Sequence, residues 1–343
     1  MCVSIYNFSK QSLKTEFERV VLHKLDYKRI WPWLYRRFSL DFAEMSDLPQ
    51  HSREILQQNF CFVSSECVEH QISQDGTEKV LLKLSDNHCI ETVMIPDRER
   101  STICVSSQVG CACGCCFCYT GTQKCVRNLY VSEIIEQILF WHRRLRDNER
   151  QISNVVFMGM GEPMHNYRNL SEALHIMLDH DGMNISRHRI TVSTSGVMNN
   201  VLAMGEEFGV RLAISLHATN NAQREKIMPI NRTYPIEEIV RIARLYPKTS
   251  NTKYVTYEYL LLSDINDTMD DAKALYELTR AHAAKINLIE FNAWNGCEYV
   301  RSKKSENFYE YLVRCGAHCS IRRSRGDDIM AACGQLNGES NLL

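Results

Sequence analysis

Residues 104–118 read CVSSQVGCACGCCFC, and they contain six of the chain's 15 cysteines. Within this stretch Cys111, Cys115 and Cys118 have the spacing C-x3-C-x2-C, which occurs nowhere else in the chain. Thiolates are the usual ligands of iron in iron–sulfur clusters, so three of them on one short loop predict such a cluster. A cluster of four irons held by three cysteines leaves one iron open to a further ligand.

Two other interpretations of these cysteines stay open at this point. A structural zinc site closes a tetrahedron of four ligands, and the overlapping C-x2-C pairs Cys113/Cys116 and Cys115/Cys118 offer four thiols. Zinc sites usually space two such pairs well apart, and the chain has no second, separate pair. The cysteines could also be incidental. Ligand type and spacing favour the cluster.

The composition limits the kind of protein. A chain of 343 residues, 44% of them hydrophobic, can bury the core of one large domain and a smaller one. The N-terminus, MCVSIYNFSKQSLK, has no apolar signal segment, and no apolar run approaches the roughly 18 residues of a membrane span. We therefore expect a cytoplasmic protein with reduced cysteines and no membrane partner. The net charge of −1 argues neither for nor against a nucleic-acid partner.

Residues 1–60 are expected to be helical. Leu13, Phe17, Val20 and Val21 recur at helical spacing and form one apolar face. Basic residues alternate with aromatic ones over this segment, which is typical of RNA contact, although acidic residues nearly balance the charge. The residues concerned are Lys10, Lys14, Arg19, Lys24, Lys28, Arg29, Trp31, Trp33, Tyr35, Arg36 and Arg37. The two tryptophans suit a buried core at least as well.

Residues 61–100 change to short alternating runs. QDGTEKVLLKL (74–84) and CIETVMIP (89–96) are separated by SDNH, which predicts a β-hairpin or small meander, and Asp75-Gly76 supplies a turn. On pattern alone, Glu91 in the second run is an exposed strand carboxylate.

From residue 101 onward, strand patterns alternate with helical patterns. This alternation predicts an α/β fold with a parallel sheet, whose functional residues gather at the carboxyl ends of the strands. Six units rather than eight predict an incomplete barrel, open on one side to a large substrate. The expected strands are 101–108, 154–160, 189–195, 211–217, 254–262 and 285–292, and the expected helices include 131–147, 171–179, 235–246 and 270–283.

Polar groups follow several of the predicted strands. In GMGEP (159–163), Gly161 allows close backbone approach and Glu162 could bind an ammonium group together with nearby carbonyls. Each such residue alone is more often a turn or helix-cap residue. Together, beside a cluster motif, they predict one ligand pocket. The other strand-end residues are Ser193, Ser195, Ser215, His217 and Asn292. In the C-terminal tail, Cys333 lies between Gly326 and Gly334. The tail is therefore predicted to be a mobile loop.

The order of motifs along the chain resembles the RlmN/Cfr family of radical SAM adenine methyltransferases, from about residue 30 to residue 338. The motifs are CVSSQVGC, the cysteine triplet, RNLYVSEI, FMGMGEP, ITVSTSG, AISLHA, MPINRTYPI, KINLIEFN and RGDDIMAACGQL. The resemblance implies a partial (βα)6 radical SAM barrel with a small N-terminal helical domain and a β-hairpin extension. We accordingly expect an RNA-contacting helical domain over 1–60, the hairpin over 61–100, the barrel over 101–300, and a C-terminal helix, strand and mobile loop over 301–343.

The resemblance also implies a reaction. Such an enzyme methylates carbon 2 of an adenine in 23S rRNA, at the peptidyl-transferase centre, and of the adenine that follows the anticodon in tRNA. The implied cofactors are a [4Fe–4S] cluster and S-adenosylmethionine (SAM), two molecules per turnover, with an external electron donor such as flavodoxin. A radical is needed because carbon 2 is neither acidic nor nucleophilic.

Residue roles follow from the same resemblance. Cys111, Cys115 and Cys118 match the cluster ligands. Cys333 matches the cysteine that a first SAM methylates, Cys104 the cysteine that resolves the RNA adduct by forming a disulfide with it, and Glu91 the proton acceptor. The positions that match SAM-contacting residues are Gly161, Glu162, Ser193, Ser215, Leu216, His217 and Asn292.

The chain departs from the family pattern at three further thiols, Cys113, Cys116 and Cys125. We expect the first two to be bystanders, because the triplet spacing selects the ligands. The RGDDI, GEP and STSG segments favour carbon 2 over the alternative of a Cfr-like enzyme that methylates carbon 8. A non-enzymatic zinc-dependent RNA-binding module is the remaining alternative.

Overall fold

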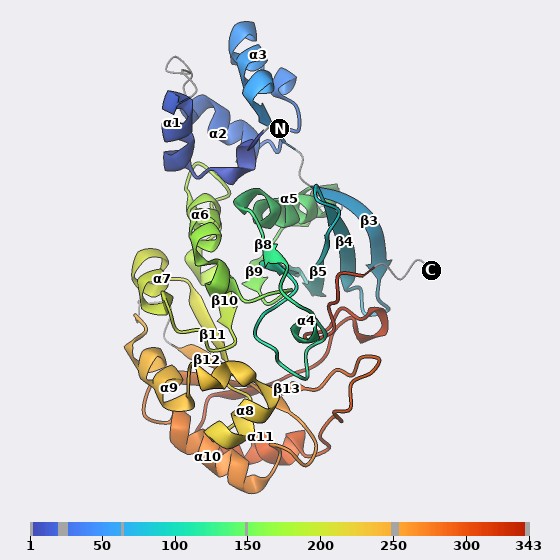
Figure 1. Cartoon of the computed structure of the whole chain (residues 1–343), viewed down its shortest axis with the longest axis vertical. Coiled ribbons are helices and arrows are strands. Elements are labelled where there is room, and N and C mark those ends of the chain that lie inside the picture. The colour runs from blue at the N-terminus through green and yellow to red at the C-terminus, as the bar shows by residue number, and fades with distance from the viewer. Residues whose placement is uncertain (1–2, 20–26, 63–64, 148–149, 248–253, 340–343) are drawn as a thin grey trace.

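The computed structural model of the chain describes residues 3–19, 27–62, 65–147, 150–247 and 254–339. A single ten-stranded sheet forms its centre, in the order β14-β13-β12-β11-β10-β9-β6-β5-β4-β3. As Figure 1 shows, the N-terminal helices lie at one end of the molecule above α5 and α6, and α10 and α11 lie at the other end.

All six predicted barrel strands are present, and each pairs in parallel with the next one along the chain. β14 from the C-terminal segment adds a seventh parallel strand beside β13. The strands are β6 (Arg100–Cys104), β9 (Asn154–Phe157), β10 (Ile190–Thr194), β11 (Arg211–Ser215), β12 (Val255–Leu261), β13 (Ala284–Glu290) and β14 (Cys319–Arg322). The predicted α/β class is confirmed.

The predicted meander is also confirmed. β3 (Ser65–Ile72), β4 (Glu78–Leu84) and β5 (Cys89–Asp97) are antiparallel, and β5 pairs with β6, so the meander continues the barrel sheet. Gly76 in the β3–β4 turn has φ +81°, a conformation that glycine adopts without strain.

Helices alternate with the parallel strands as their apolar periodicity predicts. The longest, α5 (Val131–Asp147), buries Ile134, Ile135, Ile138 and Leu145 against the sheet. The others after β6 are α4 (Tyr119–Thr122), α6 (Tyr167–Leu178), α7 (Val201–Phe208), α8 (Asn221–Ile227), α9 (Ile236–Leu245), α10 (Met269–Thr279) and α11 (Ser305–Arg314).

The N-terminal segment contains α1 (Lys10–Arg19), α2 (Tyr27–Tyr35) and α3 (Gln50–Asn59). Leu13 and Phe17 are buried as predicted, whereas Val20 and Val21 lie outside the described residues. Trp31 and Trp33 are buried and donate their indole N–H groups to Asp179 at 3.0 Å and Asp47 at 2.6 Å. These two tryptophans are therefore core residues.

Two short strand pairs complete the fold. β1 (Val3–Ser4) pairs in parallel with β2 (Phe60–Cys61), which joins the two ends of the N-terminal segment. β7 (Gln108–Val109) pairs antiparallel with β8 (Arg127–Asn128), and this pair closes the base of the cysteine-rich loop.

The C-terminal tail, expected as a mobile loop, is fastened by hydrogen bonds. Tyr119 N–H donates to the Gly334 carbonyl at 2.7 Å, and the Thr120 hydroxyl donates to the Leu336 carbonyl. Movement of Cys333 would therefore require these bonds to break.

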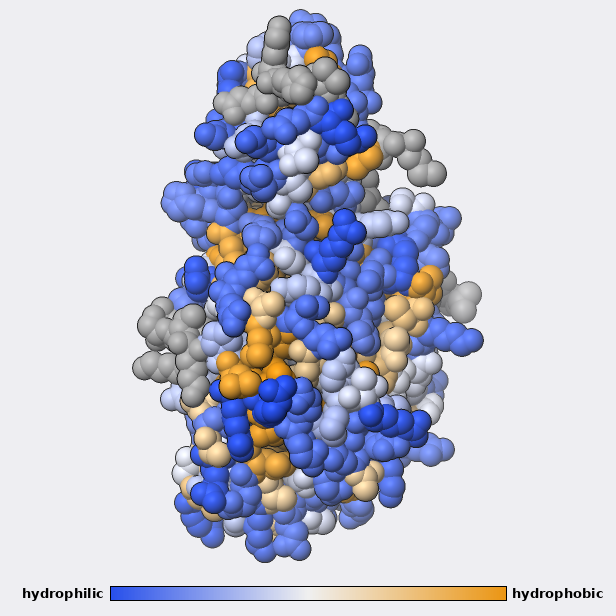
Figure 2. Space-filling model, turned by 60° about the vertical axis from the view of Figure 1, so that its left-hand side comes forward, coloured by the Kyte–Doolittle hydropathy of each residue, from blue (hydrophilic) through white to orange (hydrophobic). Residues whose placement is uncertain are grey.

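Polar side chains dominate the face shown in Figure 2, with apolar ones gathered in a band over its lower half. None of the described helices has both the length and the apolar character needed to span a membrane.

Candidate active site

The cysteine-rich loop runs from β7 to β8 and passes over the carboxyl ends of the parallel strands. A cavity lies between this loop and the ends of β9, β10 and β11, as expected for a parallel sheet. Its lining includes Cys111, Cys113, Cys115, Cys118, Gly161, Glu162, Ser193, Ser195, Ser215, His217, Glu258, Arg322 and Cys333.

The three cysteines of the triplet all line this cavity. Burial raises the pKa of Cys115, with the Cys118 and Cys111 charges adding to it, and burial raises the pKa of Cys118 to about 11. A hydrogen bond with the Cys113 side chain lowers the pKa of Cys111. Metal binding would ionise such thiols outright.

The geometry of the triplet also bears on the zinc alternative. Within the described ranges, no three Cys, His, Asp or Glu side chains come close enough to hold one metal ion. The triplet thiols instead line the wall of one cavity. Three thiols on one cavity wall are a donor set that fits an iron–sulfur cluster.

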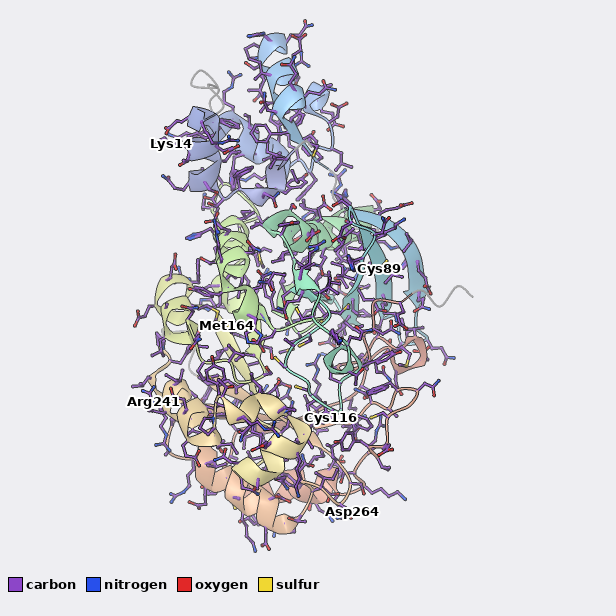
Figure 3. The ribbon with its side chains drawn as sticks, in the orientation of Figure 1. Lys14, Cys89, Cys116, Met164, Arg241 and Asp264 are labelled. Carbon is purple, nitrogen blue, oxygen red and sulfur yellow. The ribbon has the colours of Figure 1, made fainter. Side chains whose placement is uncertain are left out.

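The two thiols expected to be bystanders differ in position. Cys113 is buried in the cavity wall, where its sulfur lies 3.1 Å from Ser195 Oγ. Cys116, labelled in Figure 3, points instead toward the carbonyl of Lys226 on α8, at 3.6 Å. Only the first of these thiols lies where a ligand of the cavity would touch it.

Glu162 joins two strand ends inside the cavity. Its carboxylate accepts hydrogen bonds from Ser195 N–H at 2.6 Å, from the Ser195 hydroxyl at 2.7 Å and from Met164 N–H at 3.0 Å. Gly161 has φ +94°, and a Cβ there would lie 2.5 Å from the Gln108 side chain. Only glycine therefore fits before this buried carboxylate, which explains the GMGEP sequence.

The other predicted SAM-contacting residues divide into two groups. Ser193, Ser215 and His217 line the cavity, whereas Leu216 is buried outside its lining. His217 Nδ1 accepts from Leu260 N–H at 2.9 Å. Burial, with a further contribution from the Arg224 charge, lowers the pKa of His217 to about 3. The imidazole is therefore neutral at physiological pH.

Arg224 on α8 is a residue that the sequence reasoning missed. It is fully buried, and its guanidinium donates to the carbonyls of Leu216 at 2.9 Å, Ser195 at 2.6 Å and Ser215 at 2.9 Å. It also donates to Asn231 Oδ1 at 3.1 Å. A single side chain thus holds the ends of β10 and β11 together at the cavity. Its only signal in the sequence is its position just before the MPINRTYPI segment.

Cys333 lies between the first cavity and a second one, and it lines both. Cys104 lines the second cavity, so the fold brings these two distant thiols to one site, and both are free. Burial raises the pKa of Cys104 to about 12, with the Cys333 charge adding to it and Arg322 opposing it. Asn292 lines the second cavity rather than the first, and its side-chain amide donates to the Cys333 carbonyl at 3.3 Å.

Arg322 is a second residue that the sequence reasoning missed. It also lines both cavities, and the Cys333, Glu258 and Cys104 charges raise its pKa against the effect of burial. Glu258 is a buried carboxylate on β12 that accepts from the Asn287 amide at 3.1 and 3.2 Å. The end of β14 thus places a cation beside both reactive thiols.

Glu91 lies outside the lining of both cavities. Its side chain is 1% exposed rather than solvent-facing, because Lys79 Nζ binds one carboxylate oxygen at 2.7 Å. The other oxygen accepts from Asn337 N–H at 2.6 Å and Gly338 N–H at 3.0 Å. In this arrangement Glu91 fastens the tail that follows Cys333.

Comparison with known proteins agrees with this geometry. Residues 105–278 match the radical SAM superfamily. The chain is 45% identical over 336 residues to the dual-specificity RNA methyltransferase RlmN of Rhodopseudomonas palustris strain BisB18, a match that covers 93% of this chain and 84% of that protein. It is 46% identical over 334 residues to the protein of the same name from Bradyrhizobium diazoefficiens, with the same coverage of both chains.

A solved structure matches the whole fold. The crystal structure of a radical SAM methyltransferase from Sphaerobacter thermophilus superposes with a TM-score of 0.92 at 36% identity, covering 98% of this chain and 100% of that one. The expected radical SAM fold is thereby confirmed.

Proposed function

Because the chain belongs to the radical SAM superfamily and, within it, to the RlmN family of RNA methyltransferases, we propose that it methylates carbon 2 of adenine in 23S rRNA and in tRNA. The observation that carries this proposal is the position of Cys333, which lines the same cavity as the cysteine triplet and a second cavity with Cys104. A cysteine between two reaction partners is what a methyl-carrying thiol requires.

The triplet Cys111, Cys115 and Cys118 would hold the cluster. When bound there, a [4Fe–4S] cluster supplies the electron that cleaves SAM and starts the radical chemistry that carbon 2 requires. Glu162 and Ser195 present oxygens suited to the ammonium group of SAM. The residues at the ends of β10 and β11 would enclose the rest of the SAM molecule.

Cys333 acts first as a nucleophile. Its sulfur takes the methyl group of one SAM, the sulfonium–methyl bond breaks, and S-adenosylhomocysteine leaves. The methyl carbon on Cys333 later gives a hydrogen atom to the 5′-deoxyadenosyl radical that cleavage of a second SAM would supply, and 5′-deoxyadenosine leaves. The methylene radical that remains on Cys333 bonds to carbon 2 of the adenine. Arg322 places positive charge beside this thiol, which favours the thiolate needed for the first transfer.

Cys104 and Glu91 complete the reaction. The ring radical left by this addition must give up one electron, which the cluster held by the triplet would accept, and Glu91 takes the ring proton from carbon 2. The Cys104 sulfur, as its thiolate, then attacks the Cys333 sulfur. The electron pair of the broken bond between Cys333 and the methyl carbon stays on that carbon, which takes a proton to complete the methyl group, and a disulfide remains. The carboxylate is bound to Lys79 and the tail, so its role as proton acceptor requires the tail to release it. A general base must come within hydrogen-bond reach of its proton.

The partners follow from the family. We assign RNA contact to the helical domain over residues 1–60, whose basic side chains surround an apolar core. We assign reduction of the cluster and of the disulfide to an external electron donor such as flavodoxin. The partial barrel over 101–300 and the segment over 301–343, which carries Cys333, then form the active site.

An anaerobic assay tests the function. The protein, reconstituted with iron and sulfide, is incubated with SAM, a reductant and either an rRNA fragment or tRNA, and the digested RNA is analysed by nucleoside mass spectrometry. We expect 2-methyladenosine from both RNAs, loss of product in Cys333→Ala, and a stalled protein–RNA crosslink in Cys104→Ala. A colourless protein that contains only zinc would overturn the proposal, and 8-methyladenosine would establish the Cfr-like alternative.

A further inference from the structure

A third pocket lies at the end of the barrel opposite the cysteine-rich loop. It is lined by the end of α2, the second half of α5 and the segments that lead into β9 and β10. The pocket therefore borders the amino ends of these strands, whereas the first cavity lies at their carboxyl ends. Among the described residues, it shares no lining residue with either cavity above. We call it the basic pocket, after four arginines in its lining: Arg36, Arg146, Arg150 and Arg189.

The charge of the basic pocket suits an anion. Within the described part of the chain, its lining contains no carboxylate. Arg36 donates to the His180 carbonyl at 2.7 Å and lies 3.9 Å from Asp181, and Arg150 donates to the Arg98 carbonyl at 2.9 Å. Arg146 and Arg189 are exposed, and no other described residue forms a hydrogen bond or an ion pair with either guanidinium. Because a guanidinium binds phosphate oxygens through two parallel N–H donors, this pair suits a polyphosphate.

Aromatic and apolar surface lies beside these arginines. The Phe38 ring stacks on the His142 ring, with centroids 3.8 Å apart and an angle of 30° between the planes. Phe38 has φ +56°, a strained conformation for a residue with a Cβ, and such strain is concentrated at ligand sites. The lining also contains Ile138, Leu139, Ile152 and Ile185. A flat ring gains stacking and apolar contact on a surface of this kind.

Two buried polar atoms of this lining also lack a partner. Tyr35 is 1% exposed, and neither its hydroxyl nor His142 Nδ1 has a hydrogen-bond partner among the described residues. Buried polar groups in native proteins are nearly always hydrogen-bonded, because an unpaired one keeps the cost of its desolvation. A ligand that carries hydrogen-bonding atoms beside its ring would satisfy both groups.

We propose that the basic pocket binds a nucleoside polyphosphate, with its phosphates on Arg146 and Arg189 and its base on the surface formed by Phe38 and Ile152. Phosphate-binding arginines, an apolar wall and unpaired buried polar groups together match the three parts of such a molecule. An RNA whose adenine reacts beside Cys333 would have to pass around the sheet to reach this pocket, so a small ligand fits it better. The site is independent of the proposed RNA methylation.

Calorimetric titration of the iron-loaded protein with GTP and, separately, with ATP tests the assignment. S-adenosylhomocysteine is present at saturation, so that the first cavity is occupied. We expect one nucleotide per chain, bound at least tenfold more weakly when Arg146→Gln and Arg189→Gln are combined, because two phosphate donors are lost. The control combines Arg241→Gln and Arg280→Gln, which remove two exposed arginines that pair with Glu238 and Glu277, and it should match wild type.

A second variant separates the ring from the phosphates. Phe38→Ala should weaken nucleotide binding at least fivefold and leave the affinity for inorganic triphosphate unchanged, since only the stacking surface is lost. Thermal unfolding of every variant checks that it folds. Absence of GTP and ATP binding in the wild-type protein, or equal binding in the Arg146 and Arg189 variant, would overturn the assignment. So would a loss of tRNA affinity in that variant without nucleotide binding in wild type, which would make the pocket an RNA contact instead.

Discussion

At the scale of single residues, Arg224 holds together two strand ends that border the first cavity. It is fully buried and donates to three backbone carbonyls at the ends of β10 and β11. Burial lowers its pKa to about 10, and the Cys115 and Cys113 charges partly offset that effect. The Arg224 guanidinium therefore stays charged at neutral pH, and its N–H groups donate mainly to backbone carbonyl oxygens.

We expect Arg224→Met to lower the free energy of unfolding by about 3–5 kcal/mol, because it leaves several buried acceptors without a donor. Arg224→Lys should recover only part of this loss, since an ammonium group cannot reproduce the planar fork of donors. Arg241→Met is the matched control, because Arg241 is exposed and, among the residues that the structure describes, forms its ion pair with Glu238 on the same helix. Urea unfolding of the three variants measures the difference, and equal midpoints for Arg224→Met and Arg241→Met would contradict the prediction.

His217 makes stability depend on pH. Its folded-state pKa of about 3 lies below the ordinary value of 6.5, so the unfolded chain binds the proton first as the pH falls. The stabilising contribution of neutral His217 to the free energy of unfolding is therefore fully present above pH 6.5. It is lost at up to about 1.4 kcal/mol per pH unit as the pH falls from 6.5 to 3.

Urea unfolding at pH 7.5, 6.0 and 5.0 tests this dependence. The free energy of unfolding should fall less steeply with pH in His217→Gln than in the wild-type protein, because glutamine keeps an acceptor for Leu260 N–H without binding a proton. Parallel pH profiles for the two proteins would show that His217 does not contribute.

At the scale of elements, the tail and β5 act as one unit. Glu91 on β5 binds Lys79 on β4 and the N–H groups of Asn337 and Gly338, and the same tail is bonded to α4 next to the cysteine-rich loop. The tail therefore connects the meander to the loop, with Cys333 at its start. Because Lys79 and Glu91 are both buried, loss of either charge leaves the other uncompensated.

Hydrogen exchange of the tail tests this connection without RNA. In Glu91→Gln the amide oxygen still accepts from the tail but no longer carries charge, so the amides of Asn337 and Gly338 should exchange at least tenfold faster than in wild type. Glu78→Gln, which alters a carboxylate on the same β4 strand bound to His70 and Arg144, should leave the tail unchanged. Unchanged exchange in Glu91→Gln would mean that other bonds alone hold the tail.

At the scale of the whole molecule, the reactive loop packs on the sheet through a small apolar cluster that is separate from the main core. The large apolar core contains Val155, Val192 and Ile214, whereas Cys113, Cys115 and Phe117 belong to a smaller cluster with Met228 and Leu260. The loop crosses the front of the barrel in Figure 1 and packs mainly on this smaller cluster. Loss of the metal should therefore disturb the loop more than the fold.

Chelation of iron under anaerobic conditions tests this separation. We expect the far-ultraviolet circular dichroism and the cooperative unfolding of the chelated protein to match those of the iron-loaded protein within a few degrees, while proteolysis within residues 110–126 becomes faster. Mass spectrometry of the fragments locates the cuts. Loss of cooperative unfolding on chelation would show instead that the cluster supports the whole fold.

Much of the fold was predictable because its signals are local. The six barrel strands, the meander and the main helices follow from periodicities within a few residues of each other, and all are present in the structure. The cavity lining by Glu162, Ser193, Ser215 and His217 was predictable for a related reason, since residues at the carboxyl ends of parallel strands meet at one edge of the sheet.

The sequence by itself determined the cysteine triplet and the α/β architecture, because ligand spacing and strand patterns are properties of short segments. Only the tertiary structure decided that Cys333 lies between two cavities, that Arg322 and Cys104 lie beside it, that Arg224 fastens two strand ends, and that Glu91 is buried against Lys79 and the tail. These contacts join segments that are distant along the chain, so no local pattern encodes them. They arise when the sheet closes and buried polar groups must find partners.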